Sequence, residues 1–432
     1  MAEPHGSLIP PGYRQRLINP LAQELLLTFG GLLIRGPKYC GKTWTGRSLA
    51  NSEFSLMDSE NAPVDLELLQ SAPGLALQGA SPHLVDEWQE LPTLWDMVRN
   101  AIDASNKERL FILTGSSTPR AFKPRHSGVG RIAKINMRPM SLFESGHSNG
   151  IVSLKGLFDG LDVQGVSPLV DVSELANLVV RGGWPGISQT SASSPGLVAT
   201  NYIESFIEED MHRIDEQRRD AGKMERLMQS LARNAEQAAT PKTLIRDMTE
   251  DALHAPLAAE TVDDYMDVLE RAFILETIGP WSPNVRSSMR LNKKPKYHYV
   301  DPSLPAAILK MAPSMLLGDF EAFGFLFESL CMRDLLVYAQ AMNARVFYYR
   351  DRDDLEIDAV VEAPDGSWGG IEIKLGHHQV EKAASNLKSV RRKIVDAGGR
   401  EPAFLAVVEG VSSYAYRRQD GVYVVPIATL GA

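Results

Sequence analysis

The chain has 432 residues, of which 44% are hydrophobic and 23% are charged, and its formal net charge at pH 7 is -9. These values are typical of folded globular proteins, they exclude a disordered or fibrous chain, and the length predicts roughly two to three domains. The acidic balance excludes a global field that attracts nucleic acid, so contact with DNA would need a local basic patch.

The sequence contains no signal for a membrane or secreted protein. The first residues, "MAEPHGSLIPPGYRQRL", lack a basic start followed by an apolar core, and no apolar run reaches the length of a membrane span. The two cysteines, Cys40 and Cys331, form neither a disulfide framework nor a metal cluster. We therefore expect a cytoplasmic protein without a membrane partner.

Short apolar runs alternate with helical stretches between residues 30 and 140. The apolar runs are "GLLIRG", "FSLMD", "HLVDEW", "RLFILTGSS" and "AKINM". This alternation predicts an α/β domain with a parallel sheet flanked by helices.

A phosphate-binding loop follows the first of these runs. Gly36, Gly41, Lys42 and Thr43 satisfy the pattern G-x-x-x-x-G-K-[ST]. Glycines let backbone N–H groups turn toward phosphates at the start of a helix. We expect Lys42 to contact the terminal phosphates of ATP and Thr43 to bind Mg²⁺. The residues predicted to line the nucleotide site are Gly36, Pro37, Lys38, Tyr39, Cys40, Gly41, Lys42, Thr43 and Trp44.

Two adjacent carboxylates end the run "LVDEWQ". Ligands of open α/β sheets bind at the carboxyl ends of the strands, which is where Asp86 and Glu87 would emerge. We expect Asp86 to hold the Mg²⁺ ion through water and Glu87 to act as the general base on the attacking water. An acidic helix start would give the same two letters.

Two further groups are candidates for contact with the phosphates. The run "RLFILTGSS" ends in Thr114, Ser116 and Ser117, whose hydroxyls either orient a water or only cap the next helix. Arg131 lies just before the run "AKINM" and is predicted to stabilise charge during hydrolysis, in the same chain or in a neighbouring subunit. The alternative for Arg131 is an ordinary surface arginine.

The order of the motifs resembles that of prokaryotic AAA-type ATPases of the additional-strand P-loop class, which carry a C-terminal domain of unknown function. The matching segments are "RGPKYCGKT", "LVDEWQ", "ILTGSS", "GVGRI", "RPMSLFE", "GGWPG", "YMDVLERAFIL", "YYRDRDDLEIDAVVE" and "IEIKLG". The resemblance implies ATP binding and slow hydrolysis. Trp88 departs from it, since a smaller aliphatic residue usually follows the Asp-Glu pair, and the strand of Thr114 ends in hydroxyls rather than in Asn.

Four domains are expected along the chain. They are an AAA-type P-loop ATPase domain over 1–145, a helical lid or linker over 146–200, a winged-helix-like domain over 201–315, and a nuclease-like α/β domain over 316–432.

The middle of the chain is rich in amphipathic helices. The segments "TPKTLIRDM" and "TVDDYMDVLERAFIL", followed by a predicted hairpin, indicate a winged helix. Its second helix, roughly 261–272, carries Asp263, Asp264 and Asp267, which would repel phosphates and favour contact with a protein. The basic run "RSSMRLNKKPK" at 286–296 is either a wing that touches a DNA backbone or a solvated loop.

The last part of the chain holds a second group of charged residues. Asp358 in "LEIDAVVE" and Glu372 with Lys374 in "IEIKLG" give the pattern D-x13-E-x-K on neighbouring strands. The pattern resembles the PD-(D/E)XK nuclease-like fold, in which Asp358 and Glu372 would bind Mg²⁺, with Glu328 as a further ligand and Gln379 nearby. Charged residues on a half-exposed strand would give the same letters.

Three functions stay open from the sequence. The first is an ATPase whose nucleotide state moves the winged-helix and nuclease-like parts, acting on DNA. The second is a switch with little turnover that docks a protein partner through its acidic helices, and the third is a metal-dependent nuclease regulated by ATP. The sequence fixes neither the partner nor whether the chain forms a homo-oligomer.

Overall fold

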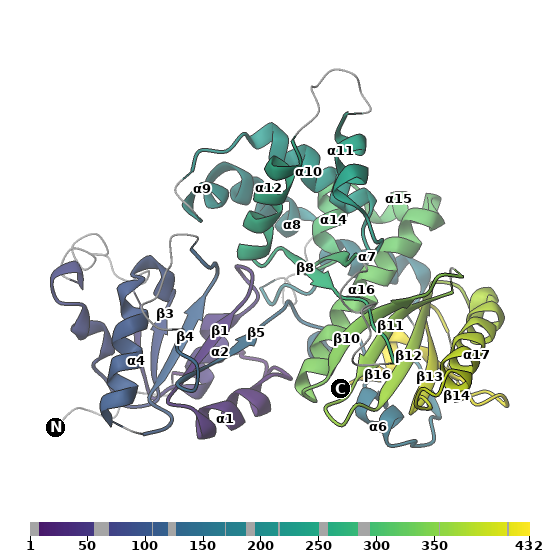
Figure 1. Ribbon diagram of the computed structural model, residues 1–432, viewed down its shortest axis with the longest axis horizontal. Coiled ribbons are helices and arrows are strands. Elements are labelled where there is room, and N and C mark those ends of the chain that lie inside the picture. Colours follow the sequence, from purple (N-terminus) through teal and green to yellow (C-terminus); the bar gives the residue numbers. More distant parts are fainter. Residues whose placement is uncertain are drawn as a thin grey trace. The chain divides into compact units, whose positions relative to one another are not determined.

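The computed structural model describes residues 8–55, 69–105, 107–119, 127–168, 170–186, 195–214, 217–249, 258–283, 294–353, 355–412 and 414–432. These residues form two compact units (Figure 1). The N-terminal unit comprises Met1–Pro139, Met211–Arg218 and Arg271–Phe273. The C-terminal unit comprises Met140–Asp210, Arg219–Glu270 and Ile274–Ala432.

The N-terminal unit is built on a five-stranded sheet in the order β2-β3-β4-β1-β5, with every neighbouring pair parallel. Strand β4 lies as an additional strand between β1, which leads into the phosphate loop, and β3, which leads into the carboxylates. The elements are α1 (Asn19–Thr28), β1 (Gly31–Arg35), α2 (Lys42–Leu49), β2 (Ser52–Ser55), η1 (Pro73–Leu77), β3 (His83–Asp86), η2 (Trp88–Glu90), α4 (Thr93–Ser105), β4 (Phe111–Gly115), β5 (Ile132–Asn136) and α9 (Met211–Arg213).

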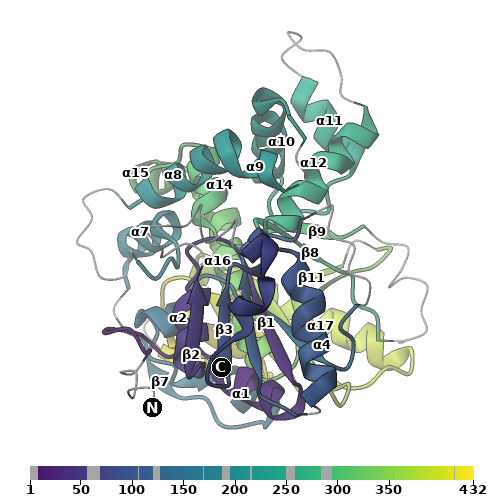
Figure 2. The same cartoon turned by 90° about the vertical axis from the view of Figure 1, so that its left-hand side faces the viewer.

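Alternating side chains of this sheet fill two cores. Leu32 and Ile34 of β1 pack with residues of α1 such as Leu26, whereas Leu33 packs on the opposite face with Val98 of α4. Each of these side chains is nearly fully buried, which stabilises the fold by about 1.5–3 kcal/mol per residue. Figure 2 shows the sheet edge-on with α4 along one side. The parallel strands therefore end together at one edge, where the loops that follow β1, β3 and β4 meet.

The C-terminal unit begins with helices and ends with a mixed sheet. Its helices are α5 (Leu142–Ser145), α6 (Leu154–Phe158), α7 (Val172–Arg181), α8 (Leu197–Ser205), η3 (Phe206–Asp210), α10 (Ala221–Arg233), α11 (Pro241–Thr249), α12 (Ala259–Arg271, the last residue of which lies in the N-terminal unit), α14 (Ser303–Ile308), α15 (Pro313–Gly318), α16 (Phe320–Ala341), η4 (His377–Gln379), α17 (Val380–Asp396) and η5 (Ile427–Thr429). Its strands are β6 (Val152–Ser153), β7 (Gly165–Val166), β8 (Leu275–Ile278), β9 (Lys296–Tyr299), β10 (Arg345–Arg350), β11 (Glu356–Glu362), β12 (Trp368–Lys374), β13 (Phe404–Glu409), β14 (Tyr414–Arg417), β15 (Tyr423–Pro426) and β16 (Leu430–Gly431).

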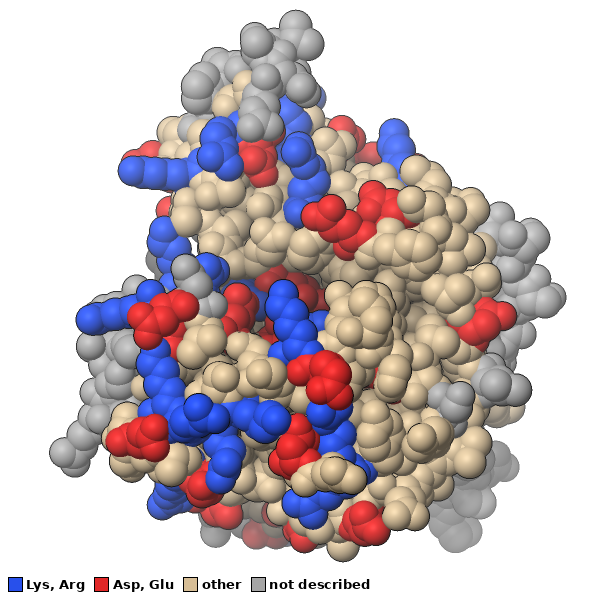
Figure 3. All heavy atoms as spheres, turned by 90° about the vertical axis from the view of Figure 1, so that its right-hand side faces the viewer, with Lys and Arg blue, Asp and Glu red and all other residues tan. Residues whose placement is uncertain are grey.

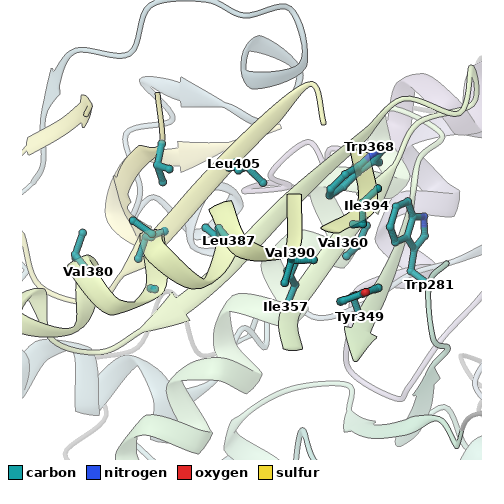
Figure 4. Packing of buried hydrophobic residues seen from close by; sticks show 14 of the residues in the cluster. Trp281, Tyr349, Ile357, Val360, Trp368, Val380, Leu387, Val390, Ile394 and Leu405 are labelled. Atoms are coloured by element: carbon teal, nitrogen blue, oxygen red, sulfur yellow. The ribbon is translucent and has the colours of Figure 1, made fainter. Parts of the chain in front are cut away.

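The mixed sheet has seven strands in the order β10-β11-β12-β13-β15-β14-β7. Strands β10, β11 and β12 form an antiparallel meander, and α17 then crosses over to β13, which is parallel to β12. Figure 4 shows the apolar side of α17, with Val380, Leu387, Val390 and Ile394, packed on the sheet beside Trp368. The predicted α/β class is thus confirmed, with a parallel sheet first, helices in the middle and a second sheet at the end.

Two short strands before α7 pair with the end of the chain. Val152–Ser153 is parallel to Leu430–Gly431, and Gly165–Val166 is antiparallel to strand β14. The expected domain boundaries assigned both segments to a lid or linker. In the structure their backbone hydrogen bonds instead join them to strands of the last domain, and strands of two residues are too short to give a periodic sequence pattern.

Within the described ranges, no helix is both long enough and apolar enough to cross a membrane.

Candidate functional site

The phosphate loop connects β1 to α2 and depends on its glycines. A Cβ atom on Gly36 would lie 2.1 Å from the carbonyl oxygen of Met137, so only glycine fits there. Gly41 has a φ of 98° and precedes the first residue of α2. Such a positive φ is cheap only for glycine. The loop therefore ends at the amino terminus of a helix, where free N–H groups and the helix dipole favour a phosphate.

Lys42, Thr43 and Asp86 lie together at the carboxyl edge of the sheet. Lys42 is 4% exposed, and its Nζ donates to the carbonyl oxygen of Pro37 at 2.8 Å. The Thr43 hydroxyl donates to Asp86 Oδ1 at 2.9 Å, and the Thr114 hydroxyl donates to the same oxygen. Burial raises the pKa of Asp86, and a divalent cation beside it would offset that effect.

Glu87 stands in a left-handed backbone conformation, with φ 52° and ψ 52°. Its backbone N–H donates to Thr114 Oγ1 at 3.1 Å. Its carboxylate oxygen Oε2 accepts hydrogen bonds from the Ser116 hydroxyl at 2.8 Å, from the Ser116 N–H at 3.2 Å and from Gln89 Nε2. A non-glycine residue in this conformation costs roughly 1–2 kcal/mol, so the hydrogen bonds hold a strained turn in place.

The pKa of Glu87 moves opposite to that of Asp86. Burial alone would raise the pKa of Glu87, but the ammonium of Lys42 and the donors on Gln89 and Ser116 outweigh burial and lower it. Glu87 is therefore a carboxylate at neutral pH, as a proton acceptor must be.

The other predicted loop residues have separate surroundings. Tyr39 and Trp44 are exposed, whereas Cys40 is buried with its thiol directed to the Met137 carbonyl oxygen at 3.6 Å. Burial raises the pKa of Cys40, so the thiolate that oxidation requires is disfavoured. Pro37 contributes its carbonyl oxygen to Lys42, and Lys38 lies in the loop between Pro37 and Tyr39.

Arg131 lies at the amino-terminal ends of the strands, whereas the phosphate loop lies at their carboxyl ends. Arg131 precedes β5, whose first residue pairs with Gly31 at the start of β1, so the length of a five-residue strand, about 16 Å, separates it from the loop. The Arg131 side chain is 49% exposed and forms an ion pair with Asp103 of α4. It does not reach the phosphate loop of its own chain. A role across a subunit interface remains a prediction.

Ser116 and Thr114 contact the two carboxylates, but Ser117 is half-buried and hydrogen-bonds to neither of them. Sequence reasoning missed two other contributors. Gln89 donates a hydrogen bond to Glu87, and its position two residues after Glu87 in "DEWQ" could have indicated this contact. Arg16 is buried beneath the loop, donating to the carbonyl oxygens of Cys40 and Arg138 at 2.8 Å each, and no local pattern indicated it.

The D-x13-E-x-K residues of the C-terminal unit also come together. Lys374 Nζ lies 2.9 Å from Asp358 Oδ2 and 2.6 Å from Glu372 Oε2. Asn386 of α17 donates to Glu372 Oε1 at 2.6 Å. Burial and the neighbouring Asp358 raise the pKa of Glu372 to about 7, because the charges of Lys374 only partly compensate. Gln379 is exposed at the start of α17.

A second lysine neutralises the remaining carboxylates of this group. Lys296 of β9 is 4% exposed, and its Nζ lies 2.7 Å from Glu356 Oε1 and 3.6 Å from Glu328 Oε1. Within the described ranges, no group of three or more His, Cys, Asp or Glu side chains is arranged to hold a metal ion. Two ammonium groups stand where the charge of a cation would be needed, so these residues do not fit a Mg²⁺ ion as they are placed.

Part of the basic surface that DNA would need is paired with acidic side chains or lies outside the described residues. Residues 286–293 of the basic run lie outside the described residues, and Lys296 is buried and paired internally. On the face in Figure 3, Lys and Arg side chains lie beside Asp and Glu side chains. The pairs around α17 include Lys388–Asp420, Arg391–Glu401 and Lys393–Asp351. Glu260, Asp263 and Glu270 are exposed on α12.

Three families match successive parts of the chain. Residues 29–145 match a family described as an AAA domain, residues 172–314 match a domain of unknown function (DUF8612), and residues 323–430 match a domain of unknown function (DUF4143). With the phosphate loop and the additional strand in place, the first match defines the N-terminal unit as an AAA-type P-loop ATPase domain.

Known proteins resemble the chain over most of its length. The uncharacterized proteins Rv2008c of Mycobacterium tuberculosis and Mb2031c of Mycobacterium bovis are each 27% identical to it over 400 residues, which is 91% of this chain and 79% of each relative. The Walker-type ATPase PABY2304 of Pyrococcus abyssi is 13% identical, with a TM-score of 0.41, and covers 70% of this chain and 99% of its own. The ORC2 protein of Aeropyrum pernix is 12% identical, with a TM-score of 0.31, and covers 72% of this chain and 98% of its own. Structural likenesses of this size carry no argument about function.

Proposed function

We propose that the protein is a Mg²⁺-dependent ATPase that converts ATP to ADP and phosphate at the edge formed by the loops after β1, β3 and β4. The observation that carries the proposal is the hydrogen bond from Thr43, at the end of the phosphate loop, to Asp86. The adjacent Glu87 lies near enough to Lys42 for its charge to lower the pKa of Glu87. A hydroxyl and a carboxylate are typical protein ligands of Mg²⁺ in nucleotide sites, where water and phosphate oxygens complete the coordination.

Each residue has a separate task in this reaction. The backbone N–H groups of residues 38–43 and the Lys42 ammonium bind the phosphates of ATP. Thr43 and Asp86 would hold a Mg²⁺ ion, which supplies neutralisation of the charge on the phosphate oxygens. Glu87 accepts a proton from the attacking water. At the same time, the water oxygen bonds to the γ-phosphorus, and the bond from the γ-phosphorus to the bridging oxygen of the β-phosphate breaks.

We further propose that the nucleotide state is passed on through the segment Arg271–Phe273. The N–H of Thr118, two residues after Ser116, donates to the Arg271 carbonyl oxygen at 3.1 Å, and the Arg35 guanidinium lies 5.7 Å from the centre of the Phe273 ring. Arg35 immediately precedes Gly36, and Arg271 ends α12. A shift of the loop after β4 or of the phosphate loop on ATP binding would therefore move the end of α12.

The order α10, α11, α12, β8 and β9 supports the winged-helix interpretation of the region around α12. The exposed acidic side chains of α12 favour a protein partner over DNA for this helix, since they would repel phosphates. No arrangement of the described residues favours nuclease activity, because lysines neutralise the carboxylates of the second group.

Steady-state hydrolysis of Mg²⁺-ATP by the wild type and by Glu87→Gln tests the proposal. We expect the variant to bind ATP as the wild type does and to lose turnover by about 10²-fold or more, since only the proton acceptor is removed. Added duplex DNA should not change the rate if α12 contacts a protein. Equal, slow turnover in both proteins with intact ATP binding would replace the ATPase with a nucleotide-dependent switch.

A further inference from the structure

Gln89 carries a buried side-chain amide, whose hydrogen-bond partners among the described residues are Glu87 and Ser116. The side chain is 8% exposed, and its Nε2 donates to Glu87 Oε2 and to Ser116 Oγ, the latter at 3.2 Å. Its carbonyl oxygen Oε1 is buried and has no hydrogen-bond partner among the described residues. A buried unpaired carbonyl costs about 1–3 kcal/mol, so an apolar side chain of the same shape would suit stability better.

The surroundings of Gln89 fix its position. A Cβ atom on Gly115 would lie 2.8 Å from Trp88 Nε1 and 3.1 Å from Gln89 Oε1, so the short helix η2 packs closely under the end of β4. Trp88 is in turn buried against Trp95, with ring centres 5.4 Å apart. The amide is therefore held by packing and cannot easily turn its oxygen elsewhere.

The two oxygens of the Glu87 carboxylate have different partners. Oε2 accepts three hydrogen bonds, one from Gln89 and two from Ser116. Oε1 accepts no hydrogen bond from the described residues. It is also not one of the polar atoms that are both fully buried and without a hydrogen-bond partner. Lys42 lies near enough to this carboxylate to lower its pKa. One oxygen is thus tied to the protein, and the other is left for a water beside the phosphates.

We propose that Gln89 is a positioning residue for ATP hydrolysis, which holds Glu87 Oε2 so that Oε1 accepts the proton of the attacking water. This inference rests on the proposed ATPase function. It assigns to Gln89 a role that acts through Glu87, whose carboxylate it contacts. Glu87, in its left-handed conformation, is the residue directly before η2, and Gln89 of η2 lies close to Gly115 at the end of β4.

The variant Gln89→Met tests the inference because methionine has a similar shape but no hydrogen-bond donor and only a weakly accepting sulfur. We expect kcat to fall by about tenfold or more, as for other misplaced catalytic groups. We expect the dissociation constant of a fluorescent ATP analogue to stay within about twofold and the melting temperature to stay equal or rise. The acid limb of the pH dependence of kcat should move to higher pH, because a carboxylate that loses a donor becomes more basic.

Two comparison variants separate the outcomes. Gln78→Met, at an exposed glutamine of the same unit, should leave every measurement unchanged. If Gln89→Met keeps the kcat and pH profile of the wild type while Glu87→Gln is inactive, the positioning role is wrong and the proposed function stands. If kcat, ATP affinity and melting temperature all fall together, Gln89 is only structural, which also overturns the inference. If Glu87→Gln hydrolyses ATP like the wild type, the proposed function itself fails.

Discussion

Single residues decide whether the phosphate loop can form at all. Glycine is required at two positions for different reasons. Gly41 adopts a positive φ, whereas Gly36 has no room for a side chain. Asp86 and Glu87 are neighbours with pKa values shifted in opposite directions, since burial dominates at Asp86 and cationic or N–H partners dominate at Glu87. In the proposed function, environment rather than residue type would separate the cation ligand Asp86 from the proton acceptor Glu87.

Replacing Gly36 by alanine tests the steric part of this account. The added Cβ would lie 2.1 Å from the backbone oxygen of Met137, so either the phosphate loop or the segment that follows β5 must move. We expect a loss of about 1–3 kcal/mol in the free energy of unfolding and a clear loss of ATP affinity, measured by chemical denaturation and by nucleotide titration.

Gly324→Ala is the matched control for this substitution. Gly324 lies inside helix α16, and nothing lies within 4 Å of an added Cβ. Alanine should therefore stabilise the protein by up to about 1 kcal/mol, because it favours a helix more than glycine does. A Gly36→Ala protein that unfolds and binds ATP like the wild type would show that the loop does not need the observed backbone path.

At the scale of elements, the regular patterns in the sequence predicted most of the sheet and helix order. Every residue of β3 and β4 is buried, and so is every residue of β1 except Arg35 at its end, as in parallel strands covered on both faces. The motif residues at the ends of these runs then had to meet at one edge. Lys42, Thr43, Asp86 and Glu87 were therefore predictable as neighbours without any structure.

Contacts between distant segments were not predictable in the same way. Arg16 reaches the carbonyl oxygen of Arg138, and strand β6 pairs with β16 across most of the chain. Neither contact produces a periodic pattern or a motif in the local sequence, since both join segments that are far apart in the chain and meet only after folding. Lys296 is a similar case, because its run of basic letters indicated a solvated surface while the structure buries its ammonium among carboxylates.

The ion-pair group of the second sheet predicts a pH dependence of stability. The pKa of Glu372, raised by burial and by Asp358, is about 7 in the folded chain against an ordinary value of 4.5. Folding therefore favours the protonated form. The stabilisation from this group is complete below pH 4.5 and is lost as the pH rises through about 7. The difference corresponds to at most about 3 kcal/mol.

The variant Glu372→Gln removes the titrating proton and keeps an oxygen for Asn386. Between pH 5 and 8, its melting temperature by circular dichroism should fall less with rising pH than that of the wild type. Glu401→Gln, at an exposed partner of Arg391, should keep the slope of the wild type. An unchanged slope in Glu372→Gln would mean that Glu372 is ionised throughout this range.

At the scale of the whole molecule, an ATPase domain is joined to two regions matched only by families of unknown function. The segment Arg271–Phe273 interrupts the C-terminal unit in sequence and lies in the N-terminal one. Through Thr118 and Arg35, this segment contacts both the loop that follows β4 and the strand that precedes the phosphate loop. We therefore expect nucleotide binding to be the event to which the rest of the chain responds.

The most direct measurement is a titration of wild type and Lys42→Ala with Mg²⁺-ATP, followed by calorimetry or by a fluorescent analogue. The Lys42 ammonium is buried in the loop and is the cation nearest to the bound phosphates in this account. We predict that the variant folds with a similar circular dichroism spectrum and loses at least about tenfold in affinity, or about 1.4 kcal/mol. Undiminished affinity of Lys42→Ala for Mg²⁺-ATP would contradict the assignment of the nucleotide site and of the ATPase reaction built on it.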